Sequence, residues 1–182
     1  MYPTTPHPKS PFTDLSLTDK LVFSPLGLKL QYFALESESQ EYNACRFELN
    51  DKKVVYRSAK ITPTKTGQFV TLWKRDPKGS IQPLDGSDTL DLIIILTKKD
   101  KNLGLFIFSK SILIEKGILN TPNKGGKRGF RVYPSWDKTT NRQAQRSQDW
   151  QSDYFIQFDI LNASIPKLLR LFDLHSESSD FN

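Results

Sequence analysis

The sequence predicts one domain of the α/β (α+β) class, in which helices flank a central mixed β-sheet. Two β-rich stretches are each divided by a short polar turn, with residues 45–49 facing residues 54–61 and residues 90–97 facing residues 103–108. This spacing is typical of two β-hairpins. A chain of 182 residues is long enough for one complete hydrophobic core and too short for two independent cores.

The domain is expected to cover residues 13–173. Residues 1–12 precede it as a flexible or extended arm, because four prolines interrupt regular structure there. Residues 174–182 follow it as an acidic tail that frays.

Local patterns predict the elements of the first two thirds of the chain. Residues 13–23 predict a helix, whereas residues 26–41 fit no single pattern. Residues 69–73 form a third β-rich run. Ser109 is a suitable N-cap for a helix that ends at Gly117.

The last third alternates strands and helices. Strands are expected at residues 130–133 and 154–158, and helices at residues 140–151 and 165–171. The helix at residues 140–151 has only two apolar residues, so it has little apolar face to bury.

Composition limits the kinds of site. The net charge of +6 and the pI near 9.3 favour an acidic partner. The single Cys45 excludes an internal disulfide, and His7 and His175 lie too near the ends for a Cys/His zinc site. The longest apolar run, residues 92–96, is too short to span a membrane, and nothing marks the N-terminus for secretion. We therefore expect a cytoplasmic protein without a cofactor or a metal.

A basic stretch runs through the middle of the chain, where no Asp or Glu occurs between Lys52 and Arg75. Cations on paired strands can neutralise phosphates, and a ring beside them can stack on an unpaired base. The candidate contacts are Arg57, Lys60, Lys65, Trp73, Lys74 and Arg75. For Trp73 the β-rich context favours burial in the core over stacking.

A second basic segment, residues 123–131, combines glycines with Lys and Arg. Glycine lets backbone N–H groups approach an anion, and Arg can hold a phosphate with two hydrogen bonds. The helix that follows adds two arginines four residues apart, hence on one face. The candidate contacts here are Lys127, Arg128, Arg131, Arg142 and Arg146. A mobile loop and a solvent-facing helix would explain the same residues.

Five blocks of the chain resemble the MepB family of bacterial proteins. The first two are residues 41–50, E-Y-N-A-C-R-F-E-L-N, and residues 59–75, A-K-I-T-P-T-K-T-G-Q-F-V-T-L-W-K-R. The others are residues 108–117, 129–136 and 141–150. The arm and the tail lie outside the resemblance.

The resemblance implies a single domain with a mixed central sheet and the core of the PD-(D/E)XK nucleases, used to bind nucleic acid. In that core an acid-x-lysine element lies on the second strand of the central hairpin. The matching triplet here is Ser58-Ala59-Lys60, with serine in place of the metal-binding acid. Loss of that acid removes a metal contact, so hydrolysis assisted by Mg²⁺ is not expected.

We therefore expect a non-enzymatic protein that binds DNA or RNA with little sequence preference and strong salt dependence, single strands being candidate ligands. One alternative is a divergent metal-dependent nuclease, which needs two carboxylates in one metal shell beside Lys60. Its candidate acids are Glu48, Asp85, Asp88 and Asp91, although Asp85 and Asp88 are also ordinary turn residues. A second alternative is a protein-interaction module that uses the basic face.

Overall fold

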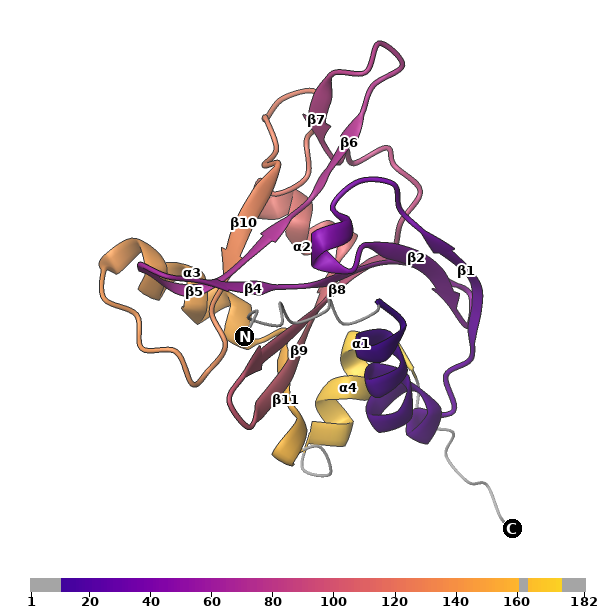
Figure 1. Ribbon diagram of the computed structural model, residues 1–182, viewed down its shortest axis with the longest axis vertical. Coiled ribbons are helices and arrows are strands. Elements are labelled where there is room, and N and C mark those ends of the chain that lie inside the picture. The colour runs from indigo at the N-terminus through magenta and orange to yellow at the C-terminus, as the bar shows by residue number, and fades with distance from the viewer. Residues whose placement is uncertain (1–10, 161–163, 175–182) are drawn as a thin grey trace, which may run out of the picture.

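The computed structural model describes residues 11–160 and 164–174 and is built on a six-stranded mixed sheet (Figure 1). The strand order is β1-β2-β3-β8-β9-β11. These strands are β1 (Leu30–Leu35), β2 (Cys45–Leu49), β3 (Lys52–Ser58), β8 (Leu92–Lys99), β9 (Asn102–Ser109) and β11 (Phe155–Gln157). The β3–β8 pair is parallel and the other pairs are antiparallel, which confirms the α+β class with a mixed central sheet.

Both predicted hairpins are present as β2–β3 and β8–β9. Their turns place Asn50 and Asp100 at φ of 53° and 55°, a left-handed conformation that Asn and Asp adopt more readily than other side chains. The predicted strand at residues 54–61 is divided, however. At Ala59 the chain leaves the main sheet after its N–H donates to the Leu96 carbonyl at 2.9 Å.

The next residues build a second, three-stranded sheet in the order β10-β5-β4. Its strands are β4 (Lys60–Thr62), β5 (Lys65–Thr71) and β10 (Gly129–Val132). The β4–β5 hairpin turns at Pro63 and Thr64, so the predicted connection over residues 62–67 is shorter than expected. The β-rich run at residues 69–73 ends β5 and begins β6 (Trp73–Arg75), which pairs with β7 (Ile81–Pro83).

Helices follow the predicted positions. The first, α1 (Pro11–Thr18), continues as a π-helix, η1 (Asp19–Phe23), and a 3-10 turn, η2 (Ser24–Leu26). Another 3-10 turn, η3 (Gln40–Tyr42), precedes β2. The others are α2 (Lys110–Glu115), α3 (Arg142–Ser152), the 3-10 turn η4 (Phe158–Ile160) and α4 (Ile165–Leu171). Ser109 caps α2 as predicted, and Asn141 caps α3 through a 2.9 Å hydrogen bond from the Ala144 N–H.

The main sheet is covered on both faces. One core packs α1, η1 and α4 on one face, where the Phe23 and Phe172 rings meet edge to face at 6.0 Å. The other core packs β5, β10, α2 and α3 on the opposite face. Because both faces of the sheet are covered, all of residues 92–96 are apolar, rather than every second one.

Residues 1–10 of the predicted arm and residues 175–182 of the predicted tail lie outside the described part of the chain. Across the residues that are described, no helix combines the length and the apolar character needed to cross a membrane.

Close packing of β9 against β11 depends on Gly104, where an added Cβ would overlap the Phe155 ring and lie 3.1 Å from the Ile156 carbonyl. We predict that Gly104→Ala lowers the free energy of unfolding by about 1–3 kcal/mol in urea denaturation, because the ring or the strand must shift. Gly125→Ala is the matched control, since a Cβ there has no neighbour within 4 Å. Equal stability of the two variants would contradict this packing.

Candidate functional site

A cleft of about 700 Å³ lies between the β4–β5 hairpin, β10 and α3, and we call it the α3 cleft. Its cationic lining residues are Lys65, Lys116, Lys127 and Arg131. Among the described residues that line it, none is Asp or Glu. Hydroxyl and amide groups of Thr64, Thr66, Asn141, Gln143 and Ser147 complete the polar wall.

The cations reach the α3 cleft from separate parts of the chain. Lys65 is exposed at the start of β5, and Lys127 is exposed two residues before β10. No ion pair joins either lysine to a carboxylate in the described segments 11–160 and 164–174. Lys116 follows α2, where it pairs with Glu115 at 2.9 Å and lies 5.8 Å from the centre of the Trp150 ring.

Arg131 lines the cleft, and its side chain also makes hydrogen bonds to neighbouring strands. From β10 its Nη2 donates to Thr62 Oγ1 at 2.6 Å and its Nη1 donates to the Gly67 carbonyl at 3.3 Å. The guanidinium also lies 5.8 Å from the centre of the Phe69 ring. The side chain therefore holds the β4–β5 hairpin against β10.

The polar helix α3 supports β10 through buried amides. Gln151 accepts a hydrogen bond from the Tyr133 N–H at 2.8 Å and donates to the Arg131 carbonyl at 2.9 Å. Gln148 donates to two backbone carbonyls of the loop between β10 and α3, those of Pro134 and Asp137. These bonds explain how a helix with two apolar residues packs on the domain, which the sequence pattern did not predict.

The two predicted arginines of α3 lie outside the α3 cleft. Arg142 and Arg146 share a face, as their spacing predicts, and line a shallow groove with Gln145 and Asp149. The cleft is lined instead by Gln143, Ser147 and Trp150, which lie on a different face of the helix.

The cations of β6 are already paired. Lys74 forms an ion pair with Asp88, and Arg75 pairs with Glu38 at 2.8 Å while lying 5.3 Å from the centre of the Trp73 ring. Trp73 is half-buried. Although residues 52–75 contain no Asp or Glu, carboxylates from other parts of the chain therefore lie beside this stretch in the folded protein.

The prediction that Arg57 contacts nucleic acid is corrected by its position, because its side chain is fully buried. It forms an ion pair with Glu36 and donates to the carbonyls of Tyr56 at 2.8 Å and Thr71 at 3.2 Å. Burial lowers the pKa of the Arg57 guanidinium, and the Glu36 carboxylate opposes that shift. Both faces of β3 are covered at residues 54–58, so the Arg57 side chain does not reach a ligand.

Two further predicted residues are exposed but do not line the α3 cleft. Lys60 lies in β4 with its Nζ 4.8 Å from the centre of the Tyr42 ring. Arg128 precedes β10, and its carbonyl accepts the Leu72 N–H at 2.8 Å.

An acid does stand beside the Ser58-Ala59-Lys60 triplet, and sequence reasoning missed it. Buried Asp14 of α1 accepts hydrogen bonds from the Ser58 hydroxyl at 2.8 Å and the Asn43 amide at 3.0 Å, and pairs with Lys98 at 2.6 Å. Both carboxylate oxygens are thus engaged by donors of the protein. The only sequence signal was an acid in the first turn of a helix, which is ordinary.

Glu48 lies in β2, and the other three acids proposed for a nuclease are engaged in contacts within the protein. Asp85 accepts from the Ser87 N–H and hydroxyl and from Asn120, Asp88 pairs with Lys74, and the Lys53 N–H donates to Asp91. Within residues 11–160 and 164–174 no three Asp, Glu, His or Cys side chains are grouped closely enough to hold a metal ion.

Hydrogen bonds lower the pKa of Asp85 from 3.8 to about 2, chiefly those from the Ser87 N–H and hydroxyl and then that from Asn120. Because the folded-state pKa lies below the unfolded value, this contribution to stability is complete above about pH 5 and is lost as the pH falls toward about 2. We predict that Asp85→Asn lowers the thermal unfolding midpoint at pH 7 and that the difference from the wild type disappears near pH 2. A constant difference across this range would contradict the prediction.

Comparison with known proteins places residues 36–157 within the family model described as MepB-like. A solved structure, "Crystal Structure of MepB", is 34% identical, with a TM-score of 0.70, and the match covers 79% of this chain and 95% of that one. A second structure, the bacterial homing endonuclease I-Ssp6803I, is 10% identical with a TM-score of 0.43, covering 76% of this chain and 88% of that one. No curated protein matches the sequence.

Proposed function

This chain belongs to the MepB-like family, and we propose that it binds nucleic acid by holding phosphates in the α3 cleft, without hydrolysing them. The observation that carries the proposal is the meeting of four cations from separate parts of the chain in one cleft whose described lining has no carboxylate. Each phosphate that a Lys or Arg neutralises releases condensed counterions, which favours binding.

The uncharged lining of the α3 cleft suits the same ligand. Hydroxyl, amide and backbone N–H groups position a phosphate backbone without reading the sequence of bases. Asn141, Gln143 and Ser147 offer such groups in the lining of the cleft. We therefore expect weak sequence preference.

The absence of hydrolysis is proposed from the contacts of the acid-x-lysine triplet. In the alignment that the family resemblance implies, Ser58 takes the position of the metal-binding acid, and its hydroxyl donates to Asp14. Asp14 is itself paired with Lys98 and bonded to Asn43, so its oxygens are already engaged. We expect supercoiled plasmid to remain uncut in Mg²⁺ or Mn²⁺, and cleavage that is lost in Asp14→Asn would contradict this part of the proposal.

A salt titration with labelled oligonucleotides tests binding by the α3 cleft. The logarithm of the association constant should fall linearly with the logarithm of the salt concentration, with a slope of about −0.7 to −0.9 per neutralised phosphate. The double variant Lys65→Gln with Lys127→Gln should reduce that slope by about 1.5 and weaken binding to all sequences alike. Both side chains are exposed, so stability should change little.

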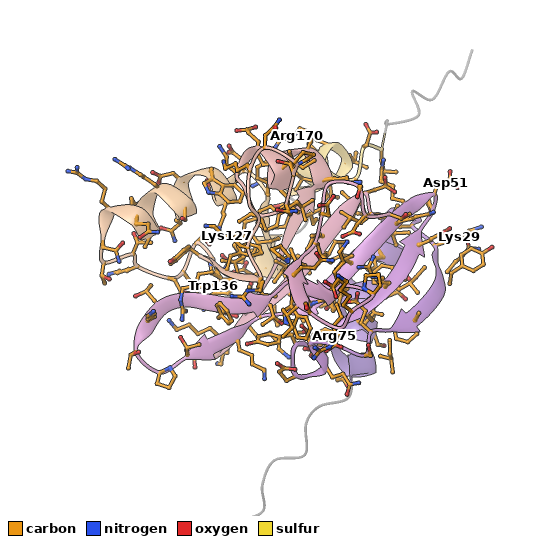
Figure 2. All side chains as sticks on the ribbon, turned by 90° about the horizontal axis from the view of Figure 1, so that it is seen from above. Lys29, Asp51, Arg75, Lys127, Trp136 and Arg170 are labelled. Carbon is orange, nitrogen blue, oxygen red and sulfur yellow. The ribbon has the colours of Figure 1, made fainter. Side chains whose placement is uncertain are left out.

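The matched control is Lys20→Gln with Lys29→Gln, which removes the same charge from exposed positions outside the cleft. Figure 2 shows Lys29 at the right edge of the molecule and Lys127 left of its centre. Equal losses in the two double variants would indicate that net charge, rather than the cleft, governs binding. Absence of binding at low salt would overturn the proposed function itself.

A further inference from the structure

The β4–β5 hairpin separates the α3 cleft from a second recess of about 560 Å³, which we call the Trp136 recess. Thr64, Lys65 and Thr66 line both spaces. The remaining wall of the Trp136 recess includes Ile61, Pro63, Trp136, Lys99 and Lys138. Lys65, on the hairpin, therefore lines both neighbouring spaces, which differ in their other lining residues.

The Trp136 recess joins apolar surface to cations. Ile61 is 56% exposed although it is a large aliphatic side chain in a strand, and Pro63, two residues on, is exposed as well. Trp136 is half-buried and packs edge to face on Phe155 at 5.4 Å. Its buried Nε1 has no hydrogen-bond partner among the described residues.

The cations of the recess are only partly neutralised. Lys99 pairs with the buried Asp137 at 2.8 Å, whereas Lys65 and Lys138 are exposed and form no ion pair within the described residues. Apolar surface flanked by lysines fits a ligand that is itself apolar in part and anionic in part. Nucleotides have this combination, since each base has a π-face and each linkage a charge.

We propose that the Trp136 recess binds unpaired bases of the strand whose phosphates lie in the α3 cleft, so that the protein selects single-stranded over double-stranded nucleic acid. This inference rests on the proposed function. In a duplex the base faces are stacked inside, and the outer surface offers phosphates and groove edges, so a duplex cannot fill an apolar recess with a base face.

The position of the two spaces agrees with one strand contacting both. They are separated by a single hairpin, whose two backbones lie about 5 Å apart. The side chains of Ile61 and Pro63 have no hydrogen-bonding group, and Pro63 also lacks a backbone N–H. Contact with a base at Ile61 and Pro63 is therefore contact with its face rather than its edge.

Binding to one oligonucleotide as a single strand and as a duplex, measured at low salt, tests the inference with Ile61→Ser. We expect the wild type to prefer the single strand, and Ile61→Ser to weaken single-strand binding on the order of fivefold, as loss of an apolar contact to a base does. Duplex binding should not change. The control is Ile81→Ser, which alters an isoleucine of similar exposure, 43%, in β7 outside the recess.

A spectroscopic readout tests the same site without relying on affinity. Because Trp150 lines the α3 cleft and would also report binding there, the measurement is made in a Trp150→Phe background. In that background a bound base should quench the fluorescence of Trp136, and adding Trp136→Phe should remove that quenching while keeping a ring against Phe155. Trp136→Phe loses no hydrogen bond within the described residues, so it should fold.

The outcomes separate this inference from the proposed function. Salt-dependent binding that is equal for single strand and duplex, or that is unaffected by Ile61→Ser, overturns the base site and leaves the α3 cleft in place. Quenching that persists after Trp136→Phe in the Trp150→Phe background likewise overturns the base site. No binding to either form overturns both proposals.

Discussion

The side chain of Arg131 joins the three strands of the second sheet, of which β5 and β10 line the α3 cleft. From β10 it reaches Thr62 in β4 and the Gly67 carbonyl in β5, while Gln151 of α3 holds the carbonyl of the same arginine. Gly67 allows the residues that follow Arg131 to pack closely on β5, because an added Cβ there would lie 2.7 Å from the Tyr133 ring, and its φ of +79° favours glycine. The hairpin and α3 are thereby fixed relative to each other, and both the cleft and the neighbouring recess depend on that arrangement.

Burial decides which of the many cations remain available to a ligand. The main sheet is covered on both faces, so Arg57 is enclosed with Glu36 and contributes to the core. Lys74 and Arg75 form ion pairs with Asp88 and Glu38, which lie outside the acid-free stretch of the sequence. The cations that line the α3 cleft come instead from β5, β10 and the loops before β10 and after α2. Local charge density along the chain is therefore a weak guide to the charge of a folded surface.

Features set by neighbouring residues were predictable from the sequence. The turns at Asn50 and Asp100, the Ser109 cap and the closing helix Ile165–Leu171 all depend on short-range contacts. The departure of the chain from the main sheet at Ala59 was not predictable, since it depends on a hydrogen bond to Leu96. The position of Asp14 beside Ser58 was not predictable either. Nor was the Trp136 recess, in which the β4–β5 hairpin and Trp136 are more than 60 residues apart in the sequence.

Amide hydrogen exchange with and without a bound oligonucleotide shows whether phosphates lie in the α3 cleft. We expect slower exchange at the start of β5, along residues 127–131 and in the first half of α3, with no change in β6 and β7. Protection confined to β6 and β7, or to the groove lined by Arg142 and Arg146 without β5, would contradict it.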